Sequence, residues 1–598
     1  MSQATLDLTR IGWPMCLTLS VVFGALGTYG AYINYISKGS DHSIEFYLGA
    51  RNSQPMLVVA WGLFGTVVGA GLTSTAILPR HLLLVPARYI ADPVTGTGYL
   101  GMIALCTFTG LPLLLATVFG PIVRAKTPLF TSIGTFADWR FGRTFGLITT
   151  LITLFTMTTT LILEYQSLAN VFTHIIGSPV EKRSAPIICA GTVVLIYVLI
   201  GGLQSSIAGA QYQSMFAMLV FAVTLLYLGA LFRPGDLGTM PTYLNTTDRG
   251  KASFVSIGTS LTASTVFSDA FWQRVWSAQT DSAIVFGSII GGVLATTVSF
   301  IFGVFSLLSA WIGLATTTNA STLFFRALGK YTPEADTQKT SLGPVWLTTL
   351  ICMASVGLNA SVVSAYQSAL TNTVMSAFLT RGFKPHAHFA RFVLLVVNIP
   401  IMVLAVTSFD AVAWVGAARL VAACAAIPLC LGMLSLFDKV INEAGCMFGS
   451  IAAVTCVILY GWVTVASGFV AGVRAVFLEG HGGWIPFFIA VVISSSATLL
   501  FAFVNIGIRS MYGWPLPEPP KPAPQPPPKE ERKKEDKPAA KKEDKPAAKK
   551  EDKPAAKKED KPAAKKEDKP AAKKEDKAEK PDAKHKPKKK VSTCKCSS

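Results

Sequence analysis

Residues 58–78 read VVAWGLFGTVVGAGLTSTAIL, an apolar segment long enough to cross a bilayer that carries Gly65, Gly69 and Gly71 near its middle. Glycine weakens a helix because nothing but the backbone restricts its conformation. A helix break in hydrocarbon leaves carbonyl groups without intrahelical partners, and each unsatisfied group is costly. Membrane transporters use such breaks to hold cations and substrates near the membrane midplane. We therefore expect an unwound helix here, whose carbonyl oxygens need partners.

A second segment, residues 354–374, could supply those partners. Its hydroxyl side chains recur at intervals of three and four residues, which places them along one helical face. The stripe consists of Ser361, Ser364, Ser368 and Thr371. Such hydroxyls also commonly bond to carbonyls of their own helix or of a neighbouring helix. Beside a broken helix that offers carbonyls, the stripe favours an all-oxygen site for a hard monovalent cation.

Two ionisable residues lie within apolar segments, Glu164 in LILEYQSLAN and Arg419 in VGAARLVAA. A charge in hydrocarbon is costly enough to be a functional candidate by default. We expect Glu164 to bind a substrate amine or amide, or to take up a coupling proton. Arg419 could be its counter-ion or could gate the outer vestibule. A structural ion pair, or snorkelling towards an interface, is the alternative for each residue.

The elements that position these residues are expected to be membrane-spanning helices. Hydrophobic residues make up 51% of the 598 residues and charged residues only 15%, with a mean hydropathy of +0.47. The chain is therefore predicted to be an all-α polytopic membrane protein whose first helix is retained and not cleaved as a signal peptide. Windows of about 20 apolar residues predict about thirteen spans. They lie near residues 13–35, 55–79, 98–122, 144–175, 185–202, 211–232, 253–271, 283–314, 343–378, 390–408, 411–436, 446–472 and 484–507.

The composition changes at Trp514, where a proline-rich stretch leads into KKEDKPAA repeated at period eight from Lys533. Such a tail cannot build a core and is predicted to be disordered. From Glu518 onward it carries 28 Lys and Arg against 17 Asp and Glu, which accounts for +11 of the net charge of +19. Beside thirteen spans, this charge favours anionic lipid over nucleic acid as a partner, and a solvated spacer is the alternative.

Orientation follows from the tail, because so many lysines are poorly exported across a membrane. A cytoplasmic tail and an odd number of spans place the N-terminus outside, although the loop charges alone do not decide this. The sequons at Asn245 and Asn319 then lie outside as glycosylation candidates. A third sequon, at Asn359, falls within a span and is interpreted as chance.

Cysteine and histidine give no sign of a cofactor. Neither the ten cysteines nor the seven histidines have the spacing of a metal site or a disulfide framework. Cys594 and Cys596, at the end of the basic tail, could be acylated and so anchor it. No cofactor and no metal other than Na⁺ is expected, and no nucleophile–base arrangement suggests an enzyme.

Several stretches resemble the sodium/solute symporter family, which has the inverted-repeat fold of the leucine transporter. YVLIGGLQS at 197–205 fits the second half of the family signature, whereas Arg183 and Cys189 break the first half. VFSDAFWQRVWSA at 266–278 and TSIGTFADWRFGR at 131–143 resemble two further family segments. With the glycine break and the serine stripe, the resemblance covers about residues 45–440.

The resemblance implies a five-plus-five helix core at 54–436, preceded by an extra helix and loop at 1–53. Two peripheral helices at 437–513 and the tail at 514–598 follow the core. Sodium would be coordinated by the carbonyls of Gly65, Val68 and Ser361 and by the hydroxyl of Ser364. Ala365 stands where many relatives have a second hydroxyl, and Ala210 where many have an aspartate tied to a second sodium. The implied coupling is therefore to one weakly held Na⁺, or to H⁺.

The implied activity is symport of a small polar organic solute by alternating access. FWQRVWSA and the stretch from Trp414 to Pro428 look most like the urea active transporter branch, which favours urea or a similar amide. Sugars, proline and choline-like solutes are the alternatives. Thr66 joins Glu164 and Arg419 as a substrate-binding candidate.

Two further charged residues, Asp269 and Arg274, are expected near an inner helix end as a gating latch. The family suggests the plasma membrane, and the sequence does not predict the oligomeric state. A nutrient sensor that signals through the tail is a different functional class, and Ala210 and Ala365 keep it open. Solute accumulation in cells would separate the two.

Overall fold

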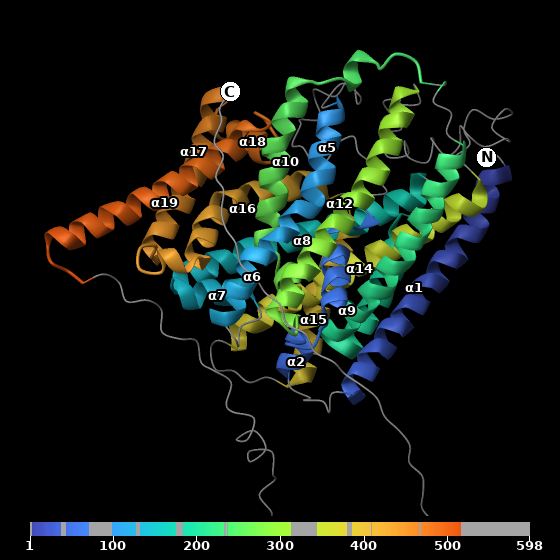
Figure 1. The fold of residues 1–598 in the computed structure, drawn as a ribbon, viewed down its shortest axis with the longest axis horizontal. Helices are drawn as coiled ribbons and strands as arrows, with labels where there is room; N and C mark the ends of the chain where they lie inside the picture. The colour runs from blue at the N-terminus through green and yellow to red at the C-terminus, as the bar shows by residue number, and fades with distance from the viewer. Residues whose placement is uncertain are drawn as a thin grey trace, which may run out of the picture. The chain divides into compact units, whose positions relative to one another are not determined.

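The computed structural model describes residues 3–37, 44–70, 98–126, 132–174, 183–231, 235, 237–312, 344–379, 386–407, 409–465 and 468–515. These residues are almost entirely helical (Figure 1). The helices are α1 (Gln3–Ser37), α2 (Ile44–Gly49), α3 (Met56–Val67), α5 (Gly98–Gly110), η2 (Leu111–Leu114), α6 (Leu115–Lys126), α7 (Ile133–Arg140), α8 (Arg143–His174), α9 (Ser184–Leu231), η5 (Thr242–Leu244), α10 (Asp248–Val266), α11 (Asp269–Ser277), α12 (Asp281–Trp311), α14 (Val345–Leu379), α15 (Ala387–Val406), α16 (Ala411–Met433), η8 (Ser435–Phe437), α17 (Glu443–Thr464), α18 (Phe469–Phe477) and α19 (Ile485–Met511).

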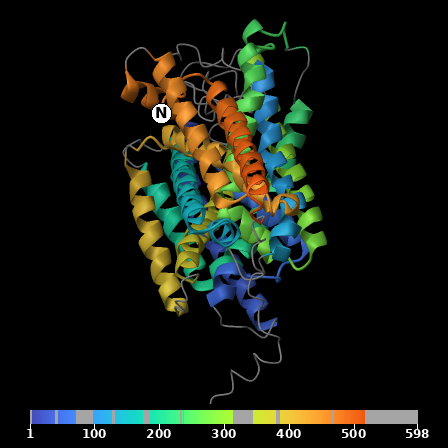
Figure 2. The same ribbon diagram turned by 90° about the vertical axis from the view of Figure 1, so that its left-hand side faces the viewer.

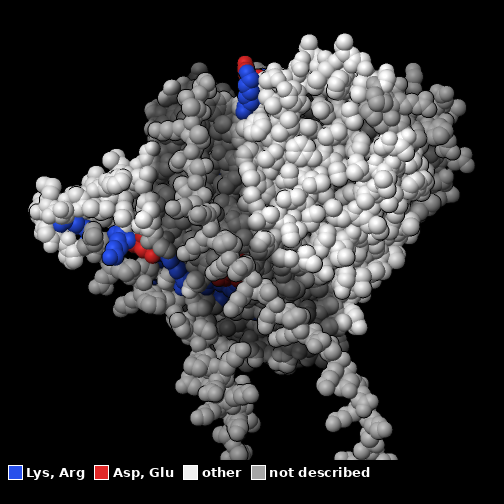
Figure 3. Space-filling view, viewed as in Figure 1, with Lys and Arg blue, Asp and Glu red and all other residues white. Residues whose placement is uncertain are grey.

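In the described part of the chain, ten helices are long and apolar enough to cross a membrane. Figure 3 agrees with this composition: the described surface on that face is almost free of charge over a broad area, and charged side chains gather mainly along its lower edge. The ten include α9 once, although it covers two predicted spans. They leave out α3 and α11, which are short, and α10, which is long enough but not apolar enough. The all-helical membrane fold predicted from the sequence is therefore confirmed.

Two predicted boundaries differ from the structure. The predicted helix end at residue 202 is confirmed, since Gly202, with φ of 58° and ψ of −142°, separates the two arms of α9, but the expected loop at 203–210 is helical. The helix continues beyond the kink because its polar side chains find partners, such as Gln204 with Gln54 at 2.8 Å. The span predicted at 446–472 ends at Thr464, and Gly468, with φ of 105°, precedes the separate helix α18.

Two helices break inside the bundle. The expected break in the first glycine-rich span is present: α3 ends at Val67, and Val68 has extended backbone angles. The continuation of this span beyond residue 70 lies outside the described residues. The span predicted at 253–271 as one helix is wrong, because α10 ends at Val266 and α11 restarts at Asp269. Here the indole N–H of Trp272 donates to the freed carbonyl of Val266 at 2.8 Å, which stabilises a break that contains no glycine.

The helices follow the same order twice. A broken helix, α3, is followed by α5–α6, α8 and the two arms of α9; a second broken helix, α10–α11, is followed by α12, α14, α15 and α16. Outside this core, α1 packs on α9 and α14, whereas α17 packs on α16 and α19. These additions lie on opposite sides of the core (Figures 1 and 2). This is the five-plus-five inverted-repeat architecture.

The two broken helices are tied together at one end. Gln54, just before α3, pairs in parallel with Ala278, just after α11. The backbone N–H of Ser53 donates to Ser277 O at 2.8 Å, and that of Gln279 donates to Gln54 O at 2.9 Å. Arg124 of α6 adds a hydrogen bond to Gln279 O at 2.8 Å and an ion pair with Asp281 at 3.0 Å. Backbone pairing therefore joins the two broken helices at this end of the bundle.

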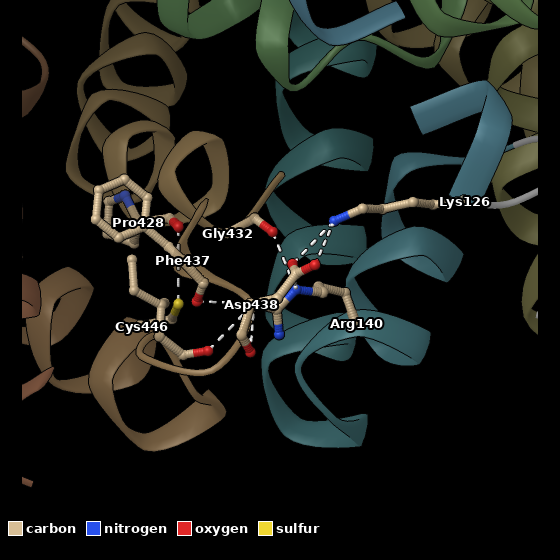
Figure 4. Close-up of polar contacts among 8 residues, drawn as sticks. Lys126, Arg140, Pro428, Gly432, Phe437, Asp438 and Cys446 are labelled. Atoms are coloured by element: carbon tan, nitrogen blue, oxygen red, sulfur yellow. Dashed lines mark hydrogen bonds and ion pairs between the residues drawn. The ribbon is translucent and has the colours of Figure 1, made fainter. Parts of the chain in front are cut away.

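Arg140, in the Arg-Phe-Gly segment, anchors the turn after α16 (Figure 4). Its Nε donates to Gly432 O at 3.0 Å and lies 3.4 Å from a carboxylate oxygen of Asp438, which also pairs with Lys126 at 2.8 Å. Its Nη2 reaches three further carbonyls, those of Phe437, Asp438 and Ile441. Burial lowers the pKa of Arg140, and the Asp438 carboxylate opposes that shift. One guanidinium thus joins α7 to four carbonyl groups at the end of α16 and in the turn after it.

We expect Arg140→Gln to destabilise the protein by about 2 kcal/mol or more, because several carbonyls would lose a charged donor. Thermal unfolding of the purified protein in detergent measures the effect. Lys126→Gln is the matched control, since the partly exposed Lys126–Asp438 pair should contribute at most about 1 kcal/mol. Equal losses in the two variants would contradict the anchoring role.

Candidate functional site

The serine stripe meets the broken helix α3. Ser361 Oγ donates to Gly65 O at 3.1 Å, and Ser364 Oγ donates to Ser361 O at 2.9 Å. The other two members of the stripe bond within α14, Ser368 to Ala365 O at 3.0 Å and Thr371 to Gln367 O at 2.8 Å. Only Ser361 therefore bonds to the broken helix α3, whereas Ser364, Ser368 and Thr371 donate to carbonyls of their own helix. Ala365 is buried and adds no side-chain oxygen.

Helix α9 contributes hydroxyls to the same place, and the sequence reasoning missed them. Ser206 Oγ lies 3.0 Å from Ser364 Oγ. A methyl group on Gly65 would lie 2.2 Å from Ser361 Oγ, 3.3 Å from Ala210 Cβ and 3.4 Å from Ser214 Oγ. Ser206, Ala210 and Ser214 are spaced by four residues, which places them on one face of a helix. This spacing would have indicated their common position if 203–210 had been predicted to be helical.

We call the oxygen cluster formed by Gly65, Ser206, Ser361 and Ser364 the cation seat. It joins α3, α9 and α14, and all four residues are buried. Val68, the remaining candidate ligand, is fully buried at the end of α3, where its carbonyl follows the last helical turn. Backbone and hydroxyl oxygens are ligands suited to a hard cation, and the seat contains no carboxylate from the described residues.

A cavity of about 330 Å³ lies beside the seat, between the two helix breaks. Val67 and Gly69 line it from the first break, and Ser268 and Phe271 from the second. Helix α8 contributes a polar wall that runs from Thr160 to Asn170. The volume of the cavity is at the lower end of the range of about 300–1,000 Å³ typical of small-molecule sites.

All three candidate substrate-binding residues, Thr66, Glu164 and Arg419, line this cavity. The Glu164 carboxylate faces the first break, because a methyl group on Gly69 would lie 2.4 Å from Glu164 Oε2. Asn359 Nδ2 donates to the Glu164 carbonyl at 2.9 Å and lies 3.4 Å from Oε2. Arg419 is 8% exposed, and its Nε has no hydrogen-bond partner among the described residues. The cavity therefore offers charges of both signs.

Tyr366 and Phe108 add aromatic surface to the wall. Thr66 directs its hydroxyl to Leu63 O at 2.7 Å, so it contributes less polarity than its type suggests. Aromatic faces close to a carboxylate are typical surroundings for an organic ammonium group.

Asp269 begins α11 directly after the second break, whereas Arg274 lies in the last turn of this helix, which is buried throughout and ends at Ser277. The Asp269 carboxylate accepts from the backbone N–H of Ile133 at 2.7 Å and from the hydroxyl of Thr373. It therefore links α11 to the start of α7 and to α14. Arg274 instead points towards Ser206, which accepts from its Nη2 at 2.9 Å.

The remaining candidates lie away from the cavity or outside the described residues. Asn245 is exposed after η5, and the sequon asparagine Asn359 is fully buried in α14. Asn319, the repeat tail and Cys594 with Cys596 fall outside the described residues. No group of three or more metal-ligating side chains occurs in the described ranges.

Comparisons with known proteins define the class. The structure aligns with the outward-open, substrate-bound state of a Na⁺-coupled sialic acid symporter, with a TM-score of 0.56 at 14% identity, covering 83% of this chain and 98% of that one. The chain thus has the inverted-repeat fold of the leucine-transporter type, as expected.

At the level of sequence, no protein-family model matches. The chain is 21% identical over 476 residues to the spermidine transporter DUR31 of Candida albicans, covering 78% of this chain and 85% of that protein. Both similar proteins are transporters and neither is an enzyme. With its apolar helices, the chain is an integral membrane protein.

We expect Gly65→Ala to disrupt the cation seat, because the new methyl group would meet Ser361 Oγ at 2.2 Å. A lower unfolding temperature of the purified protein measures the effect. Gly229→Ala, also in a helix but with open space around it, is the matched control and should be neutral or stabilising. Adding Ser361→Ala to Gly65→Ala should recover part of the loss, and no recovery would contradict the close approach.

Proposed function

We propose that the protein is a cation-coupled secondary transporter that carries a small amine-bearing organic solute across the membrane by alternating access. The observation that carries the proposal is the cavity between the two helix breaks, with the Glu164 carboxylate at its wall. Breaks of this kind place backbone dipoles and side chains around a substrate at mid-membrane depth. The coupling cation is Na⁺ or H⁺.

The charge and the aromatic side chains of the cavity wall favour an amine over other solutes. Glu164 supplies a carboxylate that can pair with an ammonium group, and Tyr366, Phe108 and Phe271 supply aromatic faces. The similarity to a spermidine transporter over most of both chains supports the same chemical class. Arg419 is the proposed counter-ion of Glu164 when the cavity holds no solute. Nothing in the comparisons supports urea, the solute that the sequence favoured.

Alternating access requires one end of the bundle to open while the other is closed. The backbone pairing of Ser53–Gln54 with Ser277–Gln279 closes one end in this structure. We propose that Asp269, which joins α11 to α7 and α14, is a latch that releases when this end opens. The orientation proposed from the tail makes this the cytoplasmic end, and the plasma membrane remains the proposed location.

The experiment that tests the function is uptake of labelled spermidine, putrescine, urea, proline and choline in cells that produce the protein. Saturable accumulation of an amine above the level in control cells supports the proposal. Preferential accumulation of urea would restore the substrate predicted from the sequence. Binding of a solute without accumulation would favour a sensor.

We expect Glu164→Gln to weaken amine uptake by about tenfold or more, because loss of a partly buried charge partner costs more than about 1.4 kcal/mol. The concentration for half-maximal uptake measures the change. Glu479→Gln is the matched control, because Glu479 pairs with Arg474 on the surface, away from the cavity. Unchanged uptake by correctly delivered Glu164→Gln protein would make Glu164 structural.

A further inference from the structure

Arg274 is a buried cation without a visible counter-charge. Its side chain belongs to α11 and is 1% exposed. Nη2 donates to Ser206 Oγ at 2.9 Å, whereas Nε and Nη1 have no hydrogen-bond partner in the described residues. None of the ion pairs formed among those residues includes Arg274. Burying an unpaired charge is strongly destabilising, so its retention calls for a role.

The guanidinium lies against the cation seat. Ser206, which accepts from Arg274, is itself 3.0 Å from Ser364 Oγ, so two hydrogen-bond lengths separate the guanidinium from the stripe. The stem of Arg274 runs past α3, where a methyl group on Gly62 would lie 3.4 Å from its Cδ and Nε. Gly62 is one turn before Gly65. The helices that supply the oxygens of the seat thus also surround the guanidinium.

A sodium ion in the seat would face this positive charge at short range. Repulsion between two like charges is much stronger in a protein interior than in water, because the effective dielectric constant is lower. The described residues of the seat include no carboxylate that could offset it, and Ala210 stands where an acid could have done so. By contrast, Arg140, which is also buried, has Asp438 and four carbonyl groups around it.

We propose that Arg274 is a tethered cation that takes the electrostatic role of Na⁺ at the seat, so that solute uptake does not require sodium. This proposal rests on the proposed function and specifies its coupling: of the two candidate cations, H⁺ remains. The guanidinium, which is attached to α11, polarises the hydroxyls of Ser206 and Ser364. A sodium ion taken up from solution would have the same effect. Because Arg274 moves with α11, its hydrogen bond to Ser206, and with it the positive charge at the seat, would change as the second broken helix changes position.

The test begins with the unmodified protein, so it does not depend on a variant that folds. Amine uptake is measured in Na⁺ medium and in N-methyl-D-glucamine medium of equal ionic strength. In parallel, thermal unfolding of the purified protein is followed against NaCl, with KCl as the control salt. We expect uptake to differ less than about twofold and Na⁺ to give no stabilisation beyond that of K⁺, as an occupied seat requires.

Two variants then separate charge from shape. Arg274→Gln removes the charge and should make Na⁺ specifically stabilising, with uptake that survives falling about tenfold when Na⁺ is withdrawn. Arg274→Lys keeps a cation and should remain insensitive to Na⁺. Specific stabilisation of the unmodified protein by Na⁺, or a tenfold loss of its uptake without Na⁺, would overturn the proposal. Absence of any uptake would instead contradict the proposed function, and the unfolding measurements would still decide the role of Arg274.

Discussion

Backbone groups freed by two helix breaks must find partners inside an apolar bundle, and this requirement organises the rest of the structure. Hydrocarbon offers no partner for a carbonyl, so each break needs a donor from elsewhere in the protein or from its cavity. At the first break the donor to Gly65 O is the Ser361 hydroxyl of α14, and at the second the donor to Val266 O is the indole of Trp272. The Ser361 hydroxyl makes the first break rich in oxygen atoms, whereas the Trp272 indole makes the second break a buried aromatic turn. The cavity lies between the two breaks.

Two of the buried arginines, Arg140 and Arg274, differ in how fully their guanidinium groups are hydrogen-bonded. Arg140 is surrounded by carbonyls and by Asp438, and its Nε and Nη2 together reach four carbonyl groups at the end of α16 and in the following turn. Arg274 has one hydrogen bond, to Ser206, and two nitrogens without partners in the described residues. A satisfied buried charge stabilises one arrangement, whereas an unsatisfied one favours a change of partner when the surrounding helices move. We therefore propose that Arg140 contributes to stability and that Arg274 contributes to coupling.

Much of this fold could be predicted from hydrophobic segments and their glycines. The break after Val67 and the long polar helix α14 are both visible in the sequence, because glycine content and hydroxyl spacing are local properties. The second break could not be found in this way, since Phe267 and Ser268 carry no local signal and a tertiary contact from Trp272 stabilises it. The sequence therefore ran one predicted helix through Asp269, which instead begins α11. Glu164 and Arg419 were identified by their cost in hydrocarbon, but the role of Asn359 beside Glu164 depends on how α8 packs on α14.

The central claim is that the two breaks enclose the site where solute binds. The most direct measurement is an experimental structure of the purified protein with saturating spermidine. The account predicts ligand density between Val68–Gly69 and Phe267–Ser268, with a nitrogen of the ligand within hydrogen-bond distance of the Glu164 carboxylate. Ligand density elsewhere in the bundle, with the space between the breaks filled by side chains, would contradict it.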